Sequence, residues 1–345
     1  MLEIFTLEQA EQWDAVVRSF ADYDVYYLSG YTKAFEIHGD GQPLLIHCHI
    51  NNTRGINVVM KRDISTLPQF KGKLTEGQLF DFCTPYGYGG WLIEGDDNDS
   101  LMAAYETWCK KNRIVSEFVR FHPVLKNADQ SQQSYDVIPL GETVAMDLSS
   151  PETIWANLTS KNRNMVRKAQ KNGVRIYSGR YEEIFETFRT IYNGTMDKDE
   201  ADAYYYFAPE FYQSVLHDLP HNAQVFFAVL DSQVIAASIM LWANDRMSYH
   251  LSGSLREFSH LAPTNLLLYE AALWGCANGC KTLHLGGGVG SKEDSLFKFK
   301  RNFYRGEDLP RFCIGKKVFN AETYDKLVAL RGELPESGFF PRYRA

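Results

Sequence analysis

The stretch VFFAVLDSQVIAASIMLW, residues 225–242, decides the fold of this chain. Its two apolar runs, Val225 to Leu230 and Val234 to Trp242, flank the turn Asp231-Ser232-Gln233, and this arrangement predicts a β-hairpin. Working outward along the chain, the next expected elements are a strand at 247–252, a helix at 263–278 and a strand at 282–285. The resulting order is hairpin, strand, helix, strand.

The first half of the chain shows the same order of elements. The expected elements there are strands at 43–49 and 56–61 around a turn at 51–55, a strand at 78–83, a helix at 100–112 and a strand at 116–123. The repetition indicates a duplication. In each copy the helix crosses between two strands that should be parallel, which predicts an α/β layered sheet with a crevice where the strand order switches.

Length and composition fit a globular protein of two domains. The chain has 345 residues, of which 45% are hydrophobic and 14% aromatic, enough to bury a large core. No apolar run approaches the roughly 18 residues of a membrane span, and Met1 to Phe5 lacks the pattern of a signal peptide. We therefore expect a cytoplasmic protein, one that could also act at the inner face of the membrane.

Charge and cysteine usage exclude some function classes. A net charge of -7 argues against a broadly basic surface that coats nucleic acid, although it leaves room for one local patch. The six cysteines are scattered, so reduced thiols are expected rather than zinc sites or disulfides. No spacing typical of a metal site or of a Ser-His-Asp triad stands out, and we expect neither a metal nor a cofactor.

Residues 295–303, SLFKFKRNF, follow soon after the expected strand end Gly286-Gly287-Gly288 and interleave bulky apolar side chains with three cations. Such a segment can anchor itself in a core while it holds positive charge at the edge of a crevice. That charge suits an anionic ligand or a developing oxyanion. The alternative is a basic amphipathic strand or loop on a solvated face.

Residues 160–173 predict a helix, with Thr159 or Ser160 as N-cap and Gly173 ending it. No acidic residue offsets its cations, which are Lys161, Arg163, Arg167, Lys168 and Lys171. Arg163 and Arg167 lie four residues apart on one face, where they could clamp a pyrophosphate bidentately. A solvated helix face is the alternative, although like charges at this spacing repel one another.

Together, several segments resemble the FemABX family of non-ribosomal aminoacyltransferases, which extend peptidoglycan stem peptides and contain two GNAT acyltransferase domains in tandem. The segments that carry the resemblance are residues 84–90, 117–123, 160–169, 195–198, 204–207 and 295–303. The resemblance covers most of the chain and implies an α/β fold of two tandem GNAT-like domains. The repeated element order and the polar stretch at 147–151 place domain 1 at 1–145 and domain 2 at 146–317. The resemblance implies that the C-terminal segment 318–345 packs back on domain 1.

The same resemblance implies an enzyme that transfers an aminoacyl group from aminoacyl-tRNA to an amine of a peptidoglycan or cell-envelope precursor, either nucleotide-linked or lipid-linked. Lys300, with the backbone around Phe299, would stabilise the tetrahedral oxyanion. The acceptor would be contacted by Arg163, Arg167, Lys198, Tyr206 and Tyr86. Residues 195–207, rich in acids and tyrosines, are expected to form a mobile loop over the acceptor.

The stretch 255–265, LREFSHLAPTN, bears on the donor. In GNAT enzymes that use coenzyme A, a glycine-rich basic loop at this place binds pyrophosphate through backbone N–H groups and a helix N-terminus. This stretch has no glycine, and Pro263 removes a donor. Two alternatives remain open: an acyl-CoA-dependent N-acyltransferase that acts on a sugar or lipid-linked glycan, and a non-catalytic protein that binds the precursor.

Overall fold

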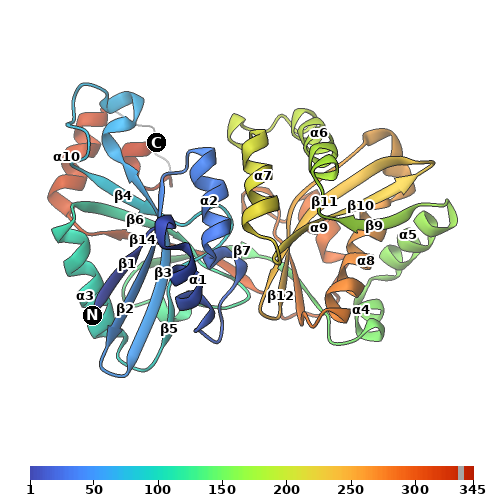
Figure 1. The fold of residues 1–345 in the computed structure, drawn as a ribbon, viewed down its shortest axis with the longest axis horizontal. Helices are drawn as coiled ribbons and strands as arrows, with labels where there is room; N and C mark the ends of the chain where they lie inside the picture. Colours follow the sequence, from blue (N-terminus) through green and yellow to red (C-terminus); the bar gives the residue numbers. More distant parts are fainter. Residues whose placement is uncertain (333–337) are drawn as a thin grey trace. The chain divides into compact units, whose positions relative to one another are not determined.

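The computed structural model describes residues 1–332 and 338–345, and the chain divides into two compact units (Figure 1). The first unit comprises Met1–Leu140 with Phe312–Ala345, and the second comprises Gly141–Arg311. The chain re-enters the first unit earlier than the expected position 318 because β14 (Arg311–Val318) pairs antiparallel with β6 (Ile114–Arg120). Of the segment 318–345, residues 333–337 lie outside the described residues.

The sheet of the first unit has the strand order β1-β2-β3-β4-β6-β14-β7, and β5 pairs with β3. Its further strands are β1 (Leu2–Phe5), β2 (Gln42–Ile50), β3 (Thr53–Asp63), β4 (Phe80–Cys83), β5 (Leu92–Glu94) and β7 (Asp136–Glu142). Its helices are α1 (Ala10–Arg18), α2 (Ser29–His38), α3 (Asn98–Lys111) and α10 (Ala321–Arg331). The predicted hairpin is β2–β3, and the crossing helix α3 joins β4 to its parallel neighbour β6.

Two buried carboxylates organise the interior of this unit. Glu117 on β6 accepts hydrogen bonds from Asn57 Nδ2 at 2.8 Å, Tyr105 Oη at 3.0 Å and Tyr135 Oη at 2.7 Å. Burial raises the pKa of the Glu117 carboxyl. The second is Asp81 on β4, whose carboxylate accepts hydrogen bonds from Tyr343 Oη at 2.9 Å and Arg344 Nε at 2.5 Å and so holds the C-terminal residues against the sheet.

The sheet of the second unit has the order β8-β13-β12-β11-β10-β9. Its strands are β8 (Val144–Asp147), β9 (Arg175–Gly179), β10 (Ala223–Leu230), β11 (Gln233–Ala243), β12 (Arg246–Ser254) and β13 (Thr282–Gly286). Its helices are α4 (Pro151–Asn157), α5 (Ser160–Lys171), α6 (Glu182–Lys198), α7 (Pro209–Asp218), α8 (Pro263–Ala277) and α9 (Ser295–Arg301). The opening sequence stretch forms the hairpin β10–β11, as predicted.

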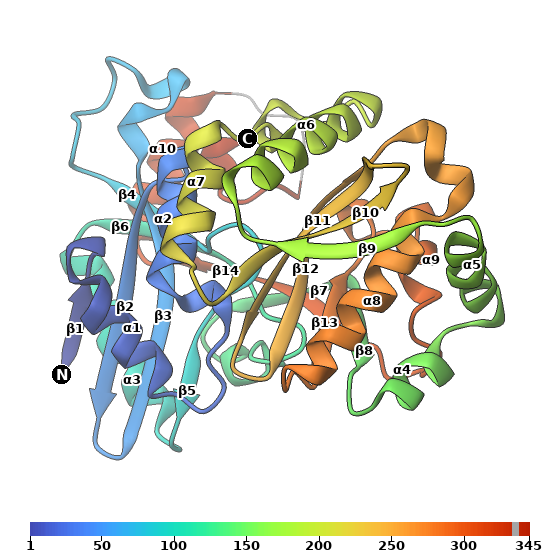
Figure 2. The same ribbon diagram turned by 45° about the vertical axis from the view of Figure 1, so that its right-hand side comes forward.

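Helices cover both faces of the second sheet (Figures 1 and 2). The helices α4, α5, α8 and α9 all contribute apolar side chains to one core, in which they meet Phe226, Met240 and Leu283 of the sheet. The helix α6 packs closely on β12, because a Cβ atom at Gly253 would lie only 2.8 Å from the Ile191 carbonyl oxygen. Among the described residues, no helix combines the length and apolarity of a membrane span.

Two segments differ from the sequence-based expectations. Residues 295–301 form the helix α9 rather than a strand or loop, because the carboxylate of Asp294 caps it by accepting the Phe297 N–H at 2.8 Å. The expected mobile loop at 195–207 begins as the last turn of α6. Thr195 is held there because its hydroxyl accepts the backbone N–H of Ser254 at 3.1 Å.

Candidate active site

The candidate site lies where the parallel strands β12 and β13 of the second unit part. Their pairing covers only Arg246 to Ser248 opposite Thr282 to His284, whereas β12 continues to Ser254. A β-bulge at His250 shifts the register of β12 just beyond the last paired residue. In open α/β sheets, ligands bind beyond the carboxyl ends of strands at such a point.

Lys300 reaches this point from α9. Only 7% of the residue is exposed, and its Nζ donates to the Gly287 carbonyl oxygen at 2.7 Å. The same Nζ lies 5.9 Å from the centre of the Tyr249 ring on β12. Loss of solvent lowers the Lys300 pKa to about 8, while the negative charge of Asp294 opposes this effect. Within the described part of the chain, Gly287 is the one hydrogen-bond acceptor of this ammonium, so two N–H donors remain for a ligand.

A compact loop after β13 fixes the partner of Lys300. Gly286 has a φ of 78°, and a Cβ atom at Gly288 would overlap the Lys292 carbonyl and the Asp294 carboxylate. Asp294 accepts the Val289 N–H at 3.0 Å in addition to capping α9. The loop therefore needs its glycines, and it presents the Gly287 carbonyl to Lys300.

The other end of α9 is joined to the start of α5. The Asn302 carbonyl oxygen accepts the Thr159 N–H at 3.0 Å and the Asn162 side-chain amide at 3.2 Å. Asn162 in turn accepts from Asn265 Nδ2 on α8 at 2.7 Å. Sequence reasoning missed this network. The sequence shows only that each of two basic segments contains an asparagine, Asn162 in one and Asn302 in the other. Neither the residue type nor the spacing reveals that these two residues meet.

Arg163 and Arg167 contact α4 and the turn that follows it. Arg163 Nη1 donates to the Leu158 carbonyl oxygen at 2.8 Å, and the Arg167 guanidinium lies 5.0 Å from the Trp155 ring centre. Both side chains come from the predicted helix, which Thr159 caps by accepting the Asn162 N–H at 3.2 Å. In the described residues, neither arginine contacts Lys300.

Phe299 belongs to α9, where its ring packs edge-on against Phe303 at 5.5 Å between ring centres. Lys198 is the last residue of α6 and forms an exposed ion pair with Asp199 at 3.2 Å. Tyr206 Oη donates to Asp197 at 2.8 Å, so this tyrosine is tied to the same helix end.

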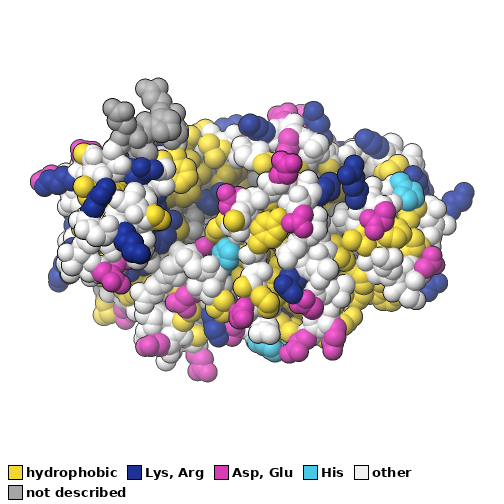
Figure 3. Space-filling view, turned by 90° about the horizontal axis from the view of Figure 1, so that it is seen from above, with side chains coloured by type: hydrophobic (Ala, Val, Ile, Leu, Met, Phe, Trp, Pro, Cys, Tyr) yellow, Lys and Arg dark blue, Asp and Glu magenta, His cyan; other side chains and the backbone are white. Residues whose placement is uncertain are grey.

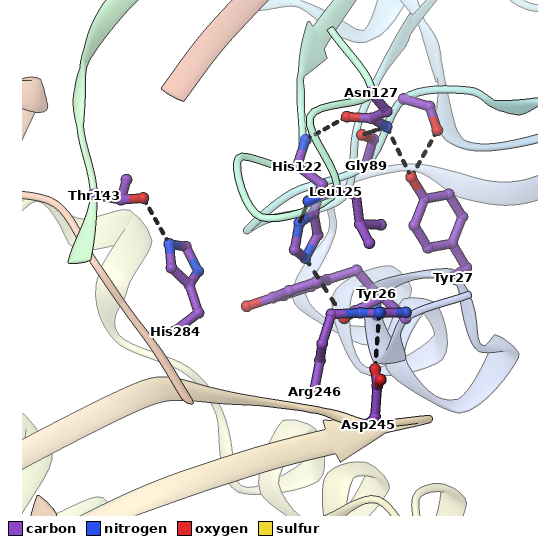
Figure 4. Close-up of polar contacts among 12 residues, drawn as sticks. Tyr26, Tyr27, Gly89, His122, Leu125, Asn127, Thr143, Asp245, Arg246 and His284 are labelled. Carbon is purple, nitrogen blue, oxygen red and sulfur yellow. Dashed lines mark hydrogen bonds and ion pairs between the residues drawn. The ribbon is translucent and has the colours of Figure 1, made fainter. Parts of the chain in front are cut away.

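Tyr86 lies in the first unit. Its carbonyl oxygen accepts from Tyr31 Oη, and its ring stacks on Phe35 at 5.6 Å. Nearby, Asn127 Nδ2 donates to the Gly89 carbonyl at 2.8 Å (Figure 4). It also donates to the Trp91 carbonyl at 3.2 Å. These bonds fix the glycine-rich turn that contains Tyr86.

Residues 160–301 match the family model described as an acetyltransferase (GNAT) domain. The match begins at the first residue of α5 and ends at the last residue of α9, so it includes both parting strands and Lys300. The chain carries a GNAT acyltransferase domain. In this GNAT domain Lys300 stands at the carboxyl ends of the two parting strands. The expectation of an acyltransferase is thus confirmed, and among curated protein sequences none matches the chain.

Solved structures extend the likeness beyond the GNAT domain to both units. FemX is 13% identical, with a TM-score of 0.69, over 94% of this chain and 99% of FemX. L-PGS from Bacillus licheniformis is 12% identical, with a TM-score of 0.54, over 95% of this chain and 98% of that one. A domain (DUF2156) assigned to a lysylphosphatidylglycerol synthetase from Agrobacterium fabrum is 13% identical, with a TM-score of 0.54, over 96% and 98%. These likenesses confirm the predicted FemABX-like α/β fold.

Proposed function

We propose that this protein is an aminoacyltransferase that moves an aminoacyl group from aminoacyl-tRNA to an amine of a peptidoglycan or cell-envelope precursor. The observation that carries the proposal is the buried Lys300 ammonium, with two unused N–H donors, at the parting of β12 and β13 in a FemX-like fold. A desolvated cation in such a place suits a reaction whose transition state develops negative charge on oxygen.

The chemistry follows from that placement. The acceptor amine attacks the ester carbonyl carbon of the donor, and the carbonyl oxygen becomes an oxyanion in the tetrahedral intermediate. The free N–H donors of Lys300 stabilise this oxygen. The ester C–O bond then breaks, and the ribose hydroxyl leaves with the proton that the amine gives up.

The segment before α8 supports aminoacyl-tRNA over an acyl-coenzyme A donor. Residues Arg256–Leu261 form a 3₁₀ helix, and Ala262 adopts a left-handed conformation with a φ of 57°. Pro263 then opens α8 without a backbone N–H. Phe258 of this segment packs against the apolar core. A pyrophosphate would therefore meet few of the backbone donors that a coenzyme A cradle requires.

The acceptor is the second substrate of the proposed reaction. We assign its phosphates and peptide to Arg163, Arg167, Lys198, Tyr206 and Tyr86, and we propose a nucleotide-linked or lipid-linked precursor. The proposal places the reaction in the cytoplasm, at the membrane face when the acceptor is lipid-linked, because aminoacyl-tRNA is made there.

The proposal is tested by offering two labelled donors in parallel with a nucleotide-linked muramyl peptide. One donor is tRNA charged with radiolabelled amino acids, and the other is labelled acetyl-coenzyme A. We expect label to move from the tRNA donor only. Titration with acetyl-coenzyme A should show binding weaker than micromolar, that is, a binding free energy less favourable than about -8 kcal/mol. Transfer from acetyl-coenzyme A alone would support the acyl-CoA alternative. Binding of the muramyl peptide without transfer from either donor would support the non-catalytic alternative.

A further inference from the structure

One segment of the second unit concentrates positive charge outside the candidate active site. No acidic residue occurs between Glu152 and Glu182, although the whole chain has a net charge of -7. The cations in this interval are Lys161, Arg163, Arg167, Lys168, Lys171, Arg175 and Arg180. On the face shown in Figure 3 acidic and basic side chains are interspersed. This interval is therefore an exception that needs a physical explanation.

Three of these cations have structural partners. Arg163 donates to the Leu158 carbonyl at 2.8 Å, and Arg180 donates to the Leu219 carbonyl at 2.7 Å. Arg167 lies over the Trp155 ring. Each of these three side chains already makes a contact within the second unit.

Lys161, Lys168 and Lys171 are different. All three are exposed, and no carboxylate of the described residues forms an ion pair with any of them. They share one side of α5, because seven residues make two helical turns and Lys171 lies one turn further. At 1.5 Å per residue the row spans roughly 15 Å. We call these three side chains the α5 lysine row.

The opposite side of α5 faces the core through Val166 and Ala169, so the helix cannot turn its lysines elsewhere. Figures 1 and 2 show α5 at the outer edge of the second unit, next to α8. Like charges at this spacing repel by a few tenths of a kcal/mol per pair. A row of unpaired cations is thus unfavourable alone and favourable beside a polyanion.

The row also starts next to the catalytic helix. The Thr159 N–H, at the start of α5, donates to the carbonyl of Asn302, which follows Lys300 by two residues. A chain of phosphates that lay along α5 would therefore lead toward the end of α9. This is the arrangement that a donor with a long phosphate backbone and a reactive 3′ end requires.

We propose that the α5 lysine row binds the phosphate backbone of the tRNA donor. This inference rests on the proposed function and names the surface that would hold its donor. RNA is favoured over a membrane surface because Asn164, on the same side of α5 as the row, is polar and exposed. A helix that lies in a membrane interface needs an exposed apolar face, and the buried Val166 and Ala169 do not provide one.

The test measures binding of fluorescently labelled, deacylated tRNA to the full chain by anisotropy, over a series of salt concentrations. The strip variant is Lys161→Gln, Lys168→Gln and Lys171→Gln together. The matched control is Lys71→Gln, Lys73→Gln and Lys126→Gln, three exposed lysines of the first unit whose loss changes the net charge equally. We expect the strip variant to bind about tenfold more weakly and its salt slope to fall by about three, one for each phosphate contact. The control should bind as the wild type does.

Enzyme assays add a second readout. In the strip variant we expect the KM for aminoacyl-tRNA to rise while kcat at saturating donor stays within about twofold, because the row lies outside the chemistry. Circular dichroism and thermal melting check that both variants are folded.

The possible outcomes separate this inference from the proposed function. If the wild type binds tRNA and the strip variant binds it equally well, the row is not the tRNA surface, while the proposed function stands. If strip and control variants weaken equally, only net charge matters, and the inference is wrong. If the wild type binds no tRNA, both the donor assignment and the inference are wrong. Vesicles with phosphatidylglycerol provide a last arm: loss of vesicle binding with unchanged tRNA binding would make the row a membrane surface.

Discussion

The two units repeat one order of elements but treat their parallel strands in opposite ways. In the first unit, backbone bonds between the β4 and β6 segments continue past the end of β4: the Thr84 N–H donates to Phe118 at 3.1 Å and the Gly89 N–H to Arg120 at 2.8 Å. In the second unit, the β12–β13 pairing stops at Ser248 opposite His284. The two parallel strands therefore stay hydrogen-bonded at their carboxyl ends in the first unit, which we call the closed end, and part in the second, which we call the open end. The repeated fold alone does not make a site.

The segment after β4 explains the closed end. Residues 84–90 make a turn and then rejoin β6 in the same parallel direction, and the turn depends on glycine. Gly90 has a φ of 89°, and a Cβ atom there would lie 2.7 Å from the Phe121 ring. A Cβ atom at Gly89 would lie 2.9 Å from the Thr84 side chain. In the second unit the chain instead leaves β12 through Arg256–Leu261, and Lys300 reaches the opening. This difference supports the proposal that the chemistry takes place in the second unit.

The largest effect should come from removing the cation at the open end. Lys300→Met keeps most of the apolar stem and deletes the charge, so we expect kcat to fall on the order of 10²–10³-fold with little change in the KM of the acceptor. Steady-state transfer kinetics measure both. Lys298→Met, on an exposed position of the same helix, is the matched control and should stay within a few-fold of wild type. Equal losses in the two variants would make α9 a structural element only.

The next effect should come from disturbing the closed end. Gly90→Ala places a Cβ atom against Phe121 and forces alanine into a left-handed conformation, so we expect the free energy of unfolding to fall by about 2–3 kcal/mol. Urea denaturation measures it. Gly39→Ala is the control, because Gly39 has a φ of 100° but no atom within 4 Å of the added Cβ, and it should cost about 1 kcal/mol. If both variants lose the same amount, the turn is not tightly packed.

A smaller effect should appear in the pH dependence of the open end. The Lys300 pKa is lowered to about 8 by burial, so the ammonium loses its proton as the pH rises through that value. If the oxyanion needs the charged form, kcat should be constant below pH 8 and fall about tenfold per pH unit above it. Initial rates from pH 6.5 to 9.5, corrected for spontaneous hydrolysis of the aminoacyl ester, measure this. Lys300→Met should lack the alkaline decline, and a decline that persists in this variant would assign it to another group.

The fold was predictable from the sequence because its signals are local and repeated. The apolar runs of β10 and β11, the turn between them and the apolar helix α8 specify their elements without tertiary information. The same pattern in the first half indicated the duplication. The helix α9 was missed because alternating apolar and basic residues fit a strand as well as a helix, although Asp294, three residues before Phe297, is a helix-capping signal.

The candidate site could be predicted only in part. The basic segment stood out because it follows a glycine-rich strand end, and the family resemblance singled out Lys300 within it. The burial of Lys300 and its Gly287 acceptor depend on how the loop closes. The parting of β12 and β13 and the bulge at His250 leave no mark in the sequence, because each strand alone reads as regular. The contact between Arg163 and the Leu158 carbonyl could not be predicted either. A helix that faces only solvent and a helix that packs against the end of another helix can have the same composition.

The smallest expected effect comes from removing the contact between α5 and the end of α4. Arg163 donates to the carbonyl of Leu158, at the end of α4, where the carbonyls lack partners within the helix. Arg163→Ala should therefore lower the free energy of unfolding by about 1 kcal/mol, the usual net contribution of one such hydrogen bond. Urea denaturation of Arg163→Ala and Arg167→Ala, each with the KM of the acceptor, separates the two roles considered for this pair. A loss of stability in Arg163→Ala with an unchanged KM would make the arginine a support for α4. A raised KM in both variants would instead assign the pair to the phosphates of the acceptor.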